Sequence, residues 1–295
     1  MKISRGTLAA GGAYVLWGFF PIYWKFLQSV SPLEILIHRI LWSLVVVLAL
    51  LAVQKQWQWL RQSQARPAIL RTFVVTGILL AVNWLVYIWA NNNGHIVEAS
   101  LGYFITPLVN VLLGLLFLHE RLRRGQWLAI GIAAAGVLYL LLNASGLLWI
   151  SLTLAFSFGI YGLLRKTAQL GSLPGLTVEM IVLCLPALAY ALFLQSSGQA
   201  VFAHGPASTT ILLALSGVVT AVPLLLFAHG ARQVTLTSLG VLQYIAPTLQ
   251  FLIGVLLYGE RFTAHRVVGF SIIWLALVIY AWDSYQLSRN PSLTG

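Results

Sequence analysis

Polar side chains recur at helical spacing inside three of the most apolar stretches of the sequence. The stripes lie within residues 97–118, 235–258 and 70–91, and their members are Tyr103, Pro107, Asn110 and Gly114; Gln243, Pro247, Gln250 and Gly254; and Thr76, Asn83, Tyr87 and Asn91. The first two follow the i, i+4, i+7, i+11 pattern of one helix face. Hydroxyl and amide groups on such a face could bind a polar organic ligand. The alternative is tight packing between helices by the same small and polar residues.

Two prolines near the middle of these stretches strengthen the ligand hypothesis. Pro107 and Pro247 have no backbone N–H, so each leaves the carbonyl four residues earlier, of Tyr103 and Gln243, without its helical donor. Unpaired backbone groups at membrane depth are tolerated where they line a water-filled space or are buried in protein. We therefore expect the stripes to meet at a shared central cavity.

Charged residues inside the apolar stretches are few. Arg39 lies about seven residues into the stretch 32–53, roughly 10 Å deep. Exposing it to lipid would cost about 2.5–3.5 kcal/mol, so we expect it to face the protein interior. Arg39 and Glu98 could be partners of a ligand or of protons, or both could be structural charges. Lys25 could extend outward to the membrane surface.

Aromatic residues accompany the polar stripes. Trp17, Trp84, Tyr87, Tyr103 and Tyr244 offer flat apolar surfaces with polar edges, which suit amphipathic organic ligands. The alternative is a role as anchors at the membrane interface.

The sequence lacks the common signatures of catalysis and metal binding. It contains no Gly-x-x-x-x-Gly-Lys-Ser/Thr loop, no His-Glu-x-x-His helix and no Gly-x-Ser-x-Gly turn, and its single aspartate is Asp283. We therefore expect no enzyme activity, no cofactor and no metal. An intramembrane enzyme acting on a lipid-linked substrate would lack a nucleophile or a carboxylate pair. A passive channel needs few special residues and stays open as an alternative.

The elements that must position these residues are membrane-spanning helices. Of the 295 residues, 60% are hydrophobic and 8% are charged, whereas about a quarter of a soluble domain is charged. Runs of about 20 apolar residues span a membrane. The ten predicted spans are 6–26, 32–53, 70–91, 97–118, 126–143, 146–165, 174–195, 209–230, 235–258 and 265–284. The net charge of +11 does not indicate nucleic-acid binding, because the basic residues flank apolar runs.

The basic residues also predict an orientation. Thirteen Lys and Arg residues, including Arg165 and Lys166, fall at one set of span ends, and only Lys25, Arg261 and Arg266 fall at the other. Since cytoplasmic loops are enriched in Lys and Arg, both termini are predicted to be cytoplasmic.

An internal repeat explains the paired stripes. Residues 107–121, PLVNVLLGLLFLHER, match residues 247–261, PTLQFLIGVLLYGER, at an offset of 140. Trp17-Gly18 and Lys25 match Phe158-Gly159 and Lys166 more weakly. Two units of five spans, 1–143 and 144–295, must have opposite orientations, which is typical of secondary transporters. The Glu-Arg pairs at the ends of the two copies, Glu120-Arg121 and Glu260-Arg261, are interpreted as capping or ion-pair groups.

The sequence resembles the EamA-type drug/metabolite transporter superfamily, and within it the RarD-like permeases. The residues that carry the resemblance are Trp17-Gly18 with Lys25, His38-Arg39 with Trp42-Ser43, Asn83-Trp84 with Trp89-Ala90, residues 98–104 (EASLGYF), Pro107-Leu108-Val109-Asn110, and Gln243-Tyr244-Ile245 before Pro247. The resemblance implies an inner-membrane carrier, most simply an exporter, of small organic molecules, driven by protons or by exchange. It also implies that Lys25 could face the substrate path. Its partners would be the substrate and the lipid bilayer, and it would act as a monomer or a homodimer.

Overall fold

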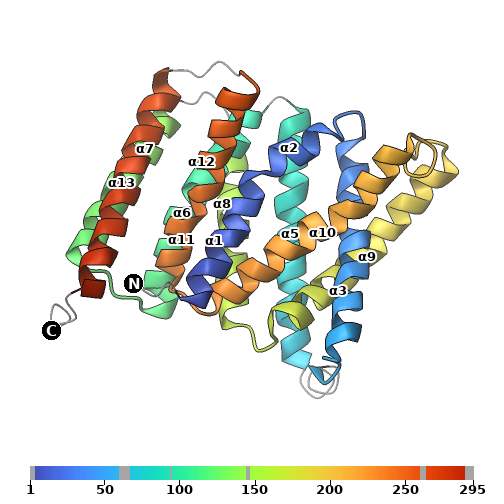
Figure 1. The fold of residues 1–295 in the computed structure, drawn as a ribbon, viewed down its shortest axis with the longest axis horizontal. Helices are drawn as coiled ribbons and strands as arrows, with labels where there is room; N and C mark the ends of the chain where they lie inside the picture. The colour runs from blue at the N-terminus through green and yellow to red at the C-terminus, as the bar shows by residue number, and fades with distance from the viewer. Residues whose placement is uncertain (1–3, 60–66, 94, 144–146, 260–263, 290–295) are drawn as a thin grey trace.

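Helices form every regular element in the part of the chain that the structure describes. The structure is a computed structural model, and it describes residues 4–59, 67–93, 95–143, 147–259 and 264–289. The helices, labelled as in Figure 1, are α1 (Arg5–Gly18), α2 (Phe20–Lys25), α3 (Pro32–Gln54), α5 (Pro67–Asn92), α6 (Ile96–Leu118), α7 (Arg124–Leu142), α8 (Leu148–Thr167), α9 (Ser172–Ser196), α10 (Ala207–Ala231), α11 (Leu236–Gln243), α12 (Ile245–Leu252), the π-helical turn η1 (Ile253–Leu257) and α13 (Ala264–Arg289).

Most of these helices can cross a membrane. Within the described ranges, eight helical segments are long and apolar enough to do so, and they overlap the predicted spans from 32–53 to 235–258. The chain is therefore a multi-pass membrane protein. The predicted span 6–26 is divided into α1 and α2 by a break at Phe19, next to Pro21 in the first turn of α2. The predicted span 265–284 lies within α13, whose apolar part is Val267–Asp283.

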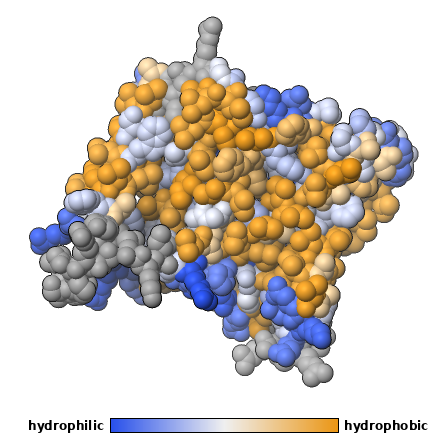
Figure 2. All heavy atoms as spheres, viewed as in Figure 1, coloured by the Kyte–Doolittle hydropathy of each residue, from blue (hydrophilic) through white to orange (hydrophobic). Residues whose placement is uncertain are grey.

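The outer surface suits a lipid environment. Figure 2 shows apolar side chains covering the middle of the visible face, with polar residues gathered toward its ends. Many large apolar side chains are solvent-exposed in the isolated chain; Leu185 is 76% exposed and Leu256 is 78% exposed. A soluble protein rarely exposes so much contiguous apolar surface.

Helices from the two predicted five-span units interleave. α6 packs on α8 and α1 on α12; α3 packs on α10 and α5 on α9; α1 packs on α10 and α5 on α8; and α7 packs on α13. Close approach depends on glycine where α10 crosses α1 and where α11 crosses α6. A Cβ atom at Gly230 would lie 2.7 Å from the backbone nitrogen of Ala10, and one at Gly240 would lie 2.7 Å from the carbonyl oxygen of Pro107.

A carboxylate links the two predicted units where α6 ends and α11 begins, and these helix ends lie at the lower end of the molecule in Figure 1. Glu120 accepts hydrogen bonds from the backbone nitrogens of Leu236 (2.5 Å) and Thr237 (3.0 Å) and from the Thr237 hydroxyl (2.7 Å). It thus caps α11, where a negative charge is favourable. Glu260 and Arg261, which match Glu120 and Arg121 in the internal repeat, lie outside the residues that the structure describes.

Candidate functional site

A cavity of about 290 Å³ lies where helices of both units meet. Its lining comes from α1, α2, α3, α5, α6, α8, α10, α11 and α12. The structure brings eight of the residues predicted as site residues or helix breaks to this one space: Trp17, Arg39, Asn83, Trp84, Tyr87, Tyr103, Gln243 and Pro247. Aromatic walls with a few polar groups are typical of small-molecule sites.

Arg39 is the cation of the cavity. Its Nε donates to the Thr220 hydroxyl at 3.0 Å. The guanidinium carbon lies 4.8 Å from the ring centroid of Trp84 and 5.0 Å from that of Trp24. No acidic residue lines the cavity, and Arg39 has no carboxylate partner in the described part of the chain.

The amide side chains around the cavity also hold helices together. Asn83 donates to the Leu154 carbonyl (3.0 Å) and to the Ser157 hydroxyl (2.9 Å), which joins α5 to α8. Gln250 donates to the Trp17 carbonyl at 3.1 Å, which has no donor four residues on because that position is Pro21. Asn83 and Gln250 therefore both line the cavity and hold neighbouring helices together.

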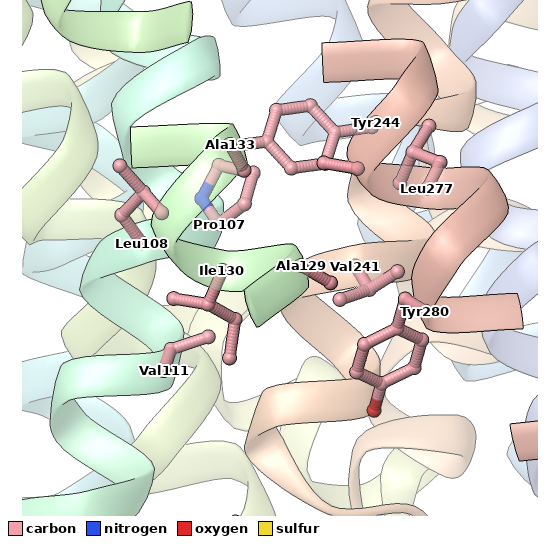
Figure 3. Close-up of a pocket in the computed structure, with 11 residues that line it drawn as sticks. Pro107, Leu108, Val111, Ala129, Ile130, Ala133, Val241, Tyr244, Leu277 and Tyr280 are labelled. Carbon is pink, nitrogen blue, oxygen red and sulfur yellow. The ribbon is translucent and has the colours of Figure 1, made fainter. Parts of the chain in front are cut away.

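Two predicted residues of the α6 stripe, Pro107 and Asn110, and the predicted aromatic residue Tyr244 lie beside the cavity and do not line it. Asn110 is buried and donates to Gln243 Oε1 at 3.1 Å. Pro107 and Tyr244 face a small apolar crevice of about 20 Å³ between α6, α7, α11 and α13, as Figure 3 shows. The Tyr244 hydroxyl donates to the Phe104 carbonyl at 3.3 Å. The cause is the crossing at Gly240, which lays α11 over this face of α6.

Two predicted charges also lie outside the cavity lining. The Lys25 ammonium is 3.6 Å from the ring centroid of Tyr258, and Lys25 is exposed. Glu98, in the first turn of α6, is buried, and its Oε1 lies 3.7 Å from His95 Nδ1. Arg39 and Glu98 therefore do not pair with each other.

A cluster of aromatic rings borders the cavity near the C-terminal ends of α8 and α10, which lie toward the lower end of the molecule in Figure 1. We call Tyr14, Trp17, Phe158, Tyr161 and Phe227 the aromatic plug. Trp17 and Phe158 are 5.7 Å apart between ring centroids, Phe158 and Phe227 are 5.3 Å apart, and the rings of Tyr161 and Phe227 stack at 5.8 Å. Tyr161 and Phe227 are fully buried, whereas Tyr87, which lines the cavity, is 38% exposed. The plug is thus closed to solvent, whereas the cavity wall at Tyr87 is open.

Sequence reasoning missed several residues of this region. Thr220, Trp24 and Phe158 line the cavity, and Tyr161 and Phe227 complete the plug. Phe227 lies in the apolar stretch 209–230, where one more aromatic residue gives no signal. Phe158 could have been found through its repeat match with Trp17.

A buried ion pair corrects the interpretation of Arg165 as a charge at a membrane surface. Arg165 is 1% exposed, and its Nη1 lies 3.7 Å from Glu179 Oε1, whose side chain is completely buried. Thr76 donates to Glu179 at 2.6 Å, and Arg165 Nη2 donates to the Ser172 carbonyl at 2.9 Å. Arg165 turns inward from the last turn of α8 and joins three helices.

Comparison with known proteins gives two successive matches along the chain. The EamA-like transporter family matches residues 4–142 and again residues 144–282. Protein RarD of Streptomyces exfoliatus is 47% identical over 97% of this chain and 90% of its own length. The uncharacterized transporter YojE of Bacillus subtilis (strain 168) is 44% identical over 98% of this chain and 97% of its own. One solved crystal structure shares the fold, with a TM-score of 0.69, 18% identity and coverage of 94% of this chain and 98% of that one.

Proposed function

The chain belongs to the EamA-like transporter family as a RarD-like permease, and from this premise we propose that it is a secondary active carrier that exports small amphipathic organic molecules. The family and the names of the relatives indicate a membrane transporter of the drug and metabolite type, not an enzyme. The observation that carries the proposal is the cavity of about 290 Å³, which has aromatic walls and is lined by helices of both predicted units.

The proposed carrier is built from two inverted units, 1–143 and 144–295, of five spans each. The helix contacts support this arrangement. In the predicted repeat, the helices of the first unit correspond in order to those of the second: α1, α3, α5, α6 and α7 to α8, α9, α10, α11–α12 and α13. Exchanging the units then turns the contact between α6 and α8 into a contact between α12 and α1, and the structure contains both. The same exchange maps α3–α10 onto α9–α5, and α1–α10 onto α8–α5. Random packing of similar helices would give no such correspondence.

The transport cycle follows from this symmetry. Units related by inversion can exchange conformations, so that a central site opens first to one side and then to the other. In the conformation described here the aromatic plug closes the lower end, which we assign to the cytoplasm together with both termini. The charge asymmetry of the loops and the bacterial relatives support ten spans in the inner membrane, with substrate leaving from the upper end.

Counterflow of substrate tests the proposal. The purified full-length chain in proteoliposomes is expected to give saturable uptake of labelled substrate that is accelerated by unlabelled substrate on the other side. A screen of antibiotics, amino acids and metabolites by thermal stabilisation supplies the probe. Uptake that rises linearly with substrate concentration and does not change when unlabelled substrate is present on the other side would indicate a passive channel instead.

Replacement of Glu98 by glutamine tests proton coupling. Glu98→Gln is expected to abolish substrate flux driven by a pH gradient and to leave counterflow at equal pH within about twofold, because exchange without a gradient needs no proton carrier. Flux is measured in proteoliposomes with an imposed pH gradient. The control is Glu34→Gln, since the Glu34 carboxylate accepts from the backbone nitrogens of Val201 and Phe202, and a glutamine oxygen can still do so. Undiminished pH-driven flux in Glu98→Gln would exclude Glu98 as the coupling group.

A further inference from the structure

The charge of the cavity identifies a class of substrate. We propose that the transported molecule is an organic monoanion, with a carboxylate or similar group bound by Arg39 and an aromatic or apolar body lying against the tryptophan and tyrosine walls. The inference rests on the carrier function proposed above and specifies what that carrier takes.

The chain supplies no anion to Arg39. It has six acidic residues in total, and the five that the structure describes are engaged elsewhere. Glu34 binds the backbone of residues 201 and 202, Glu98 lies beside His95, Glu120 caps α11, Glu179 pairs with Arg165, and Asp283 pairs with Arg123. None of the five lines the cavity, so an anion for Arg39 must come from outside the described chain.

The contrast with Arg165 shows what this absence means. Arg165 is fully buried, and the fold provides it with a buried carboxylate, Glu179. A charge loses hydration as it enters a protein interior, and without a counter-charge that loss raises the free energy. Arg39 is partly buried, and around its guanidinium it has only the neutral Thr220 hydroxyl and two aromatic faces. An anionic ligand would recover part of that cost, which a neutral or cationic ligand cannot do.

The geometry of Arg39 fits a carboxylate. Its Nε is held by Thr220, and the rings of Trp24 and Trp84 hold the guanidinium at 5.0 and 4.8 Å. The two Nη atoms form the remaining edge of the planar fork, and they donate to no acceptor in the described part of the chain. Two parallel N–H donors are the arrangement that binds carboxylates in bidentate fashion.

The rest of the cavity sets the size and charge of the ligand. Trp17, Trp84, Tyr87 and Tyr103 supply the walls, and the volume of about 290 Å³ lies near the lower limit of small-molecule sites. One guanidinium balances one negative charge, and Lys25 lies elsewhere over Tyr258. A monoanion with a compact ring therefore fits better than a phosphate dianion or a cationic drug.

Matched sets of probes test the inference on the full-length chain in lipid nanodiscs. Each set shares one apolar body and varies its charge: 3-phenylpropanoate, 3-phenylpropanamide and 3-phenylpropylamine, with corresponding sets built on benzoate and indole-3-acetate. Binding is measured by thermal stabilisation. In at least one set, we expect the anion to bind at least about tenfold more tightly than its amide, because hydrogen bonds to charged groups contribute about 1.5–3 kcal/mol, and the amine to bind most weakly.

Variants test whether Arg39 causes the preference for the anion over the amide. Arg39→Gln is expected to weaken anion binding about 10- to 100-fold, down to the level of the amide, while amide binding stays within about twofold. Arg39→Lys, which keeps the charge and loses the fork, should fall between the two. The control is Arg124→Gln, which removes an exposed cation at the start of α7 and should change neither affinity.

The outcomes separate this inference from the carrier proposal. Lack of anion preference in every set, or anion binding unaffected by Arg39→Gln, overturns the substrate class. The same holds if counterflow is found for a neutral or cationic substrate and Arg39→Gln does not alter it, in which case the carrier function stands. Selective anion binding with linear uptake and no counterflow retains the anion site and overturns the carrier. Because the comparison of anion with amide uses the unmodified protein, it decides the question even if the Arg39 variants do not fold.

Discussion

Arg165→Met is expected to lower the free energy of unfolding by about 3–5 kcal/mol, because it leaves the carboxylate of Glu179 buried without its counter-charge. Glu179 is completely buried, and besides Arg165 it has two neutral donors, Thr76 at 2.6 Å and Tyr161 at 3.5 Å. Those hydrogen bonds remain in the variant, but their hydroxyl donors are neutral and do not balance the negative charge of Glu179. The cost also includes the lost hydrogen bond from Arg165 to the Ser172 carbonyl between α8 and α9. Equilibrium unfolding by SDS titration in mixed micelles measures the change.

Two comparisons isolate the buried charge as the cause. Replacing both partners, Arg165→Met with Glu179→Leu, should recover most of the stability, since a buried pair can often be exchanged for apolar residues at little cost. Arg123→Met breaks the partly exposed pair with Asp283 and should cost only about 0.2–1 kcal/mol. If Arg165→Met is no more destabilising than Arg123→Met, the Arg165–Glu179 pair does not hold α8, α9 and α5 together.

Arg165 also marks the limit of what the sequence could reveal about the fold. Span positions follow from apolar runs of sufficient length, and this signal is local, so it located the eight spanning segments of the described chain. The direction in which a cation at the end of a span points is decided by its neighbours in space. Arg165 points into the protein because Glu179, on α9, provides its partner there. Counting it as a surface charge was reasonable from the sequence and wrong in the structure.

The candidate site also contains residues that could be predicted from the sequence and residues that could not. Arg39, Asn83, Tyr103 and Gln243 could be predicted, because a polar residue on an apolar helix must find a polar or buried environment. Asn110 and Pro107 belong to the same stripe as Tyr103, yet α11 covers them at the Gly240 crossing. The register of that crossing cannot be predicted from the sequence of either helix alone. The aromatic plug was missed because Tyr161 and Phe227 differ little from the apolar residues around them.

The plug determines where the molecule must open. At the lower end, α8 and α10 meet through the stacked rings of Tyr161 and Phe227. The repeat places Phe20 and Tyr87 at the corresponding positions of the other unit, 141 and 140 residues earlier. Both of these residues line the cavity, and Tyr87 is 38% exposed, whereas Tyr161 and Phe227 are fully buried. If the units exchange conformations, the Tyr161–Phe227 contact is the one that breaks when the site opens to the lower end.

Linking the two plug residues is therefore expected to abolish transport. In a Cys184→Ser background, which removes the one native cysteine, Tyr161→Cys with Phe227→Cys is treated with a short bifunctional thiol reagent that reductant cleaves. Counterflow should fall to the level of empty liposomes and return after reduction, while substrate binding to the cross-linked protein persists because the cavity is already open at the other end. The matched control joins α7 to α13 through Tyr139→Cys and His265→Cys, whose native rings lie 6.2 Å apart at the edge of the bundle, and it should keep most of its counterflow. Full counterflow after complete cross-linking of the plug would show that the substrate path does not pass between α8 and α10.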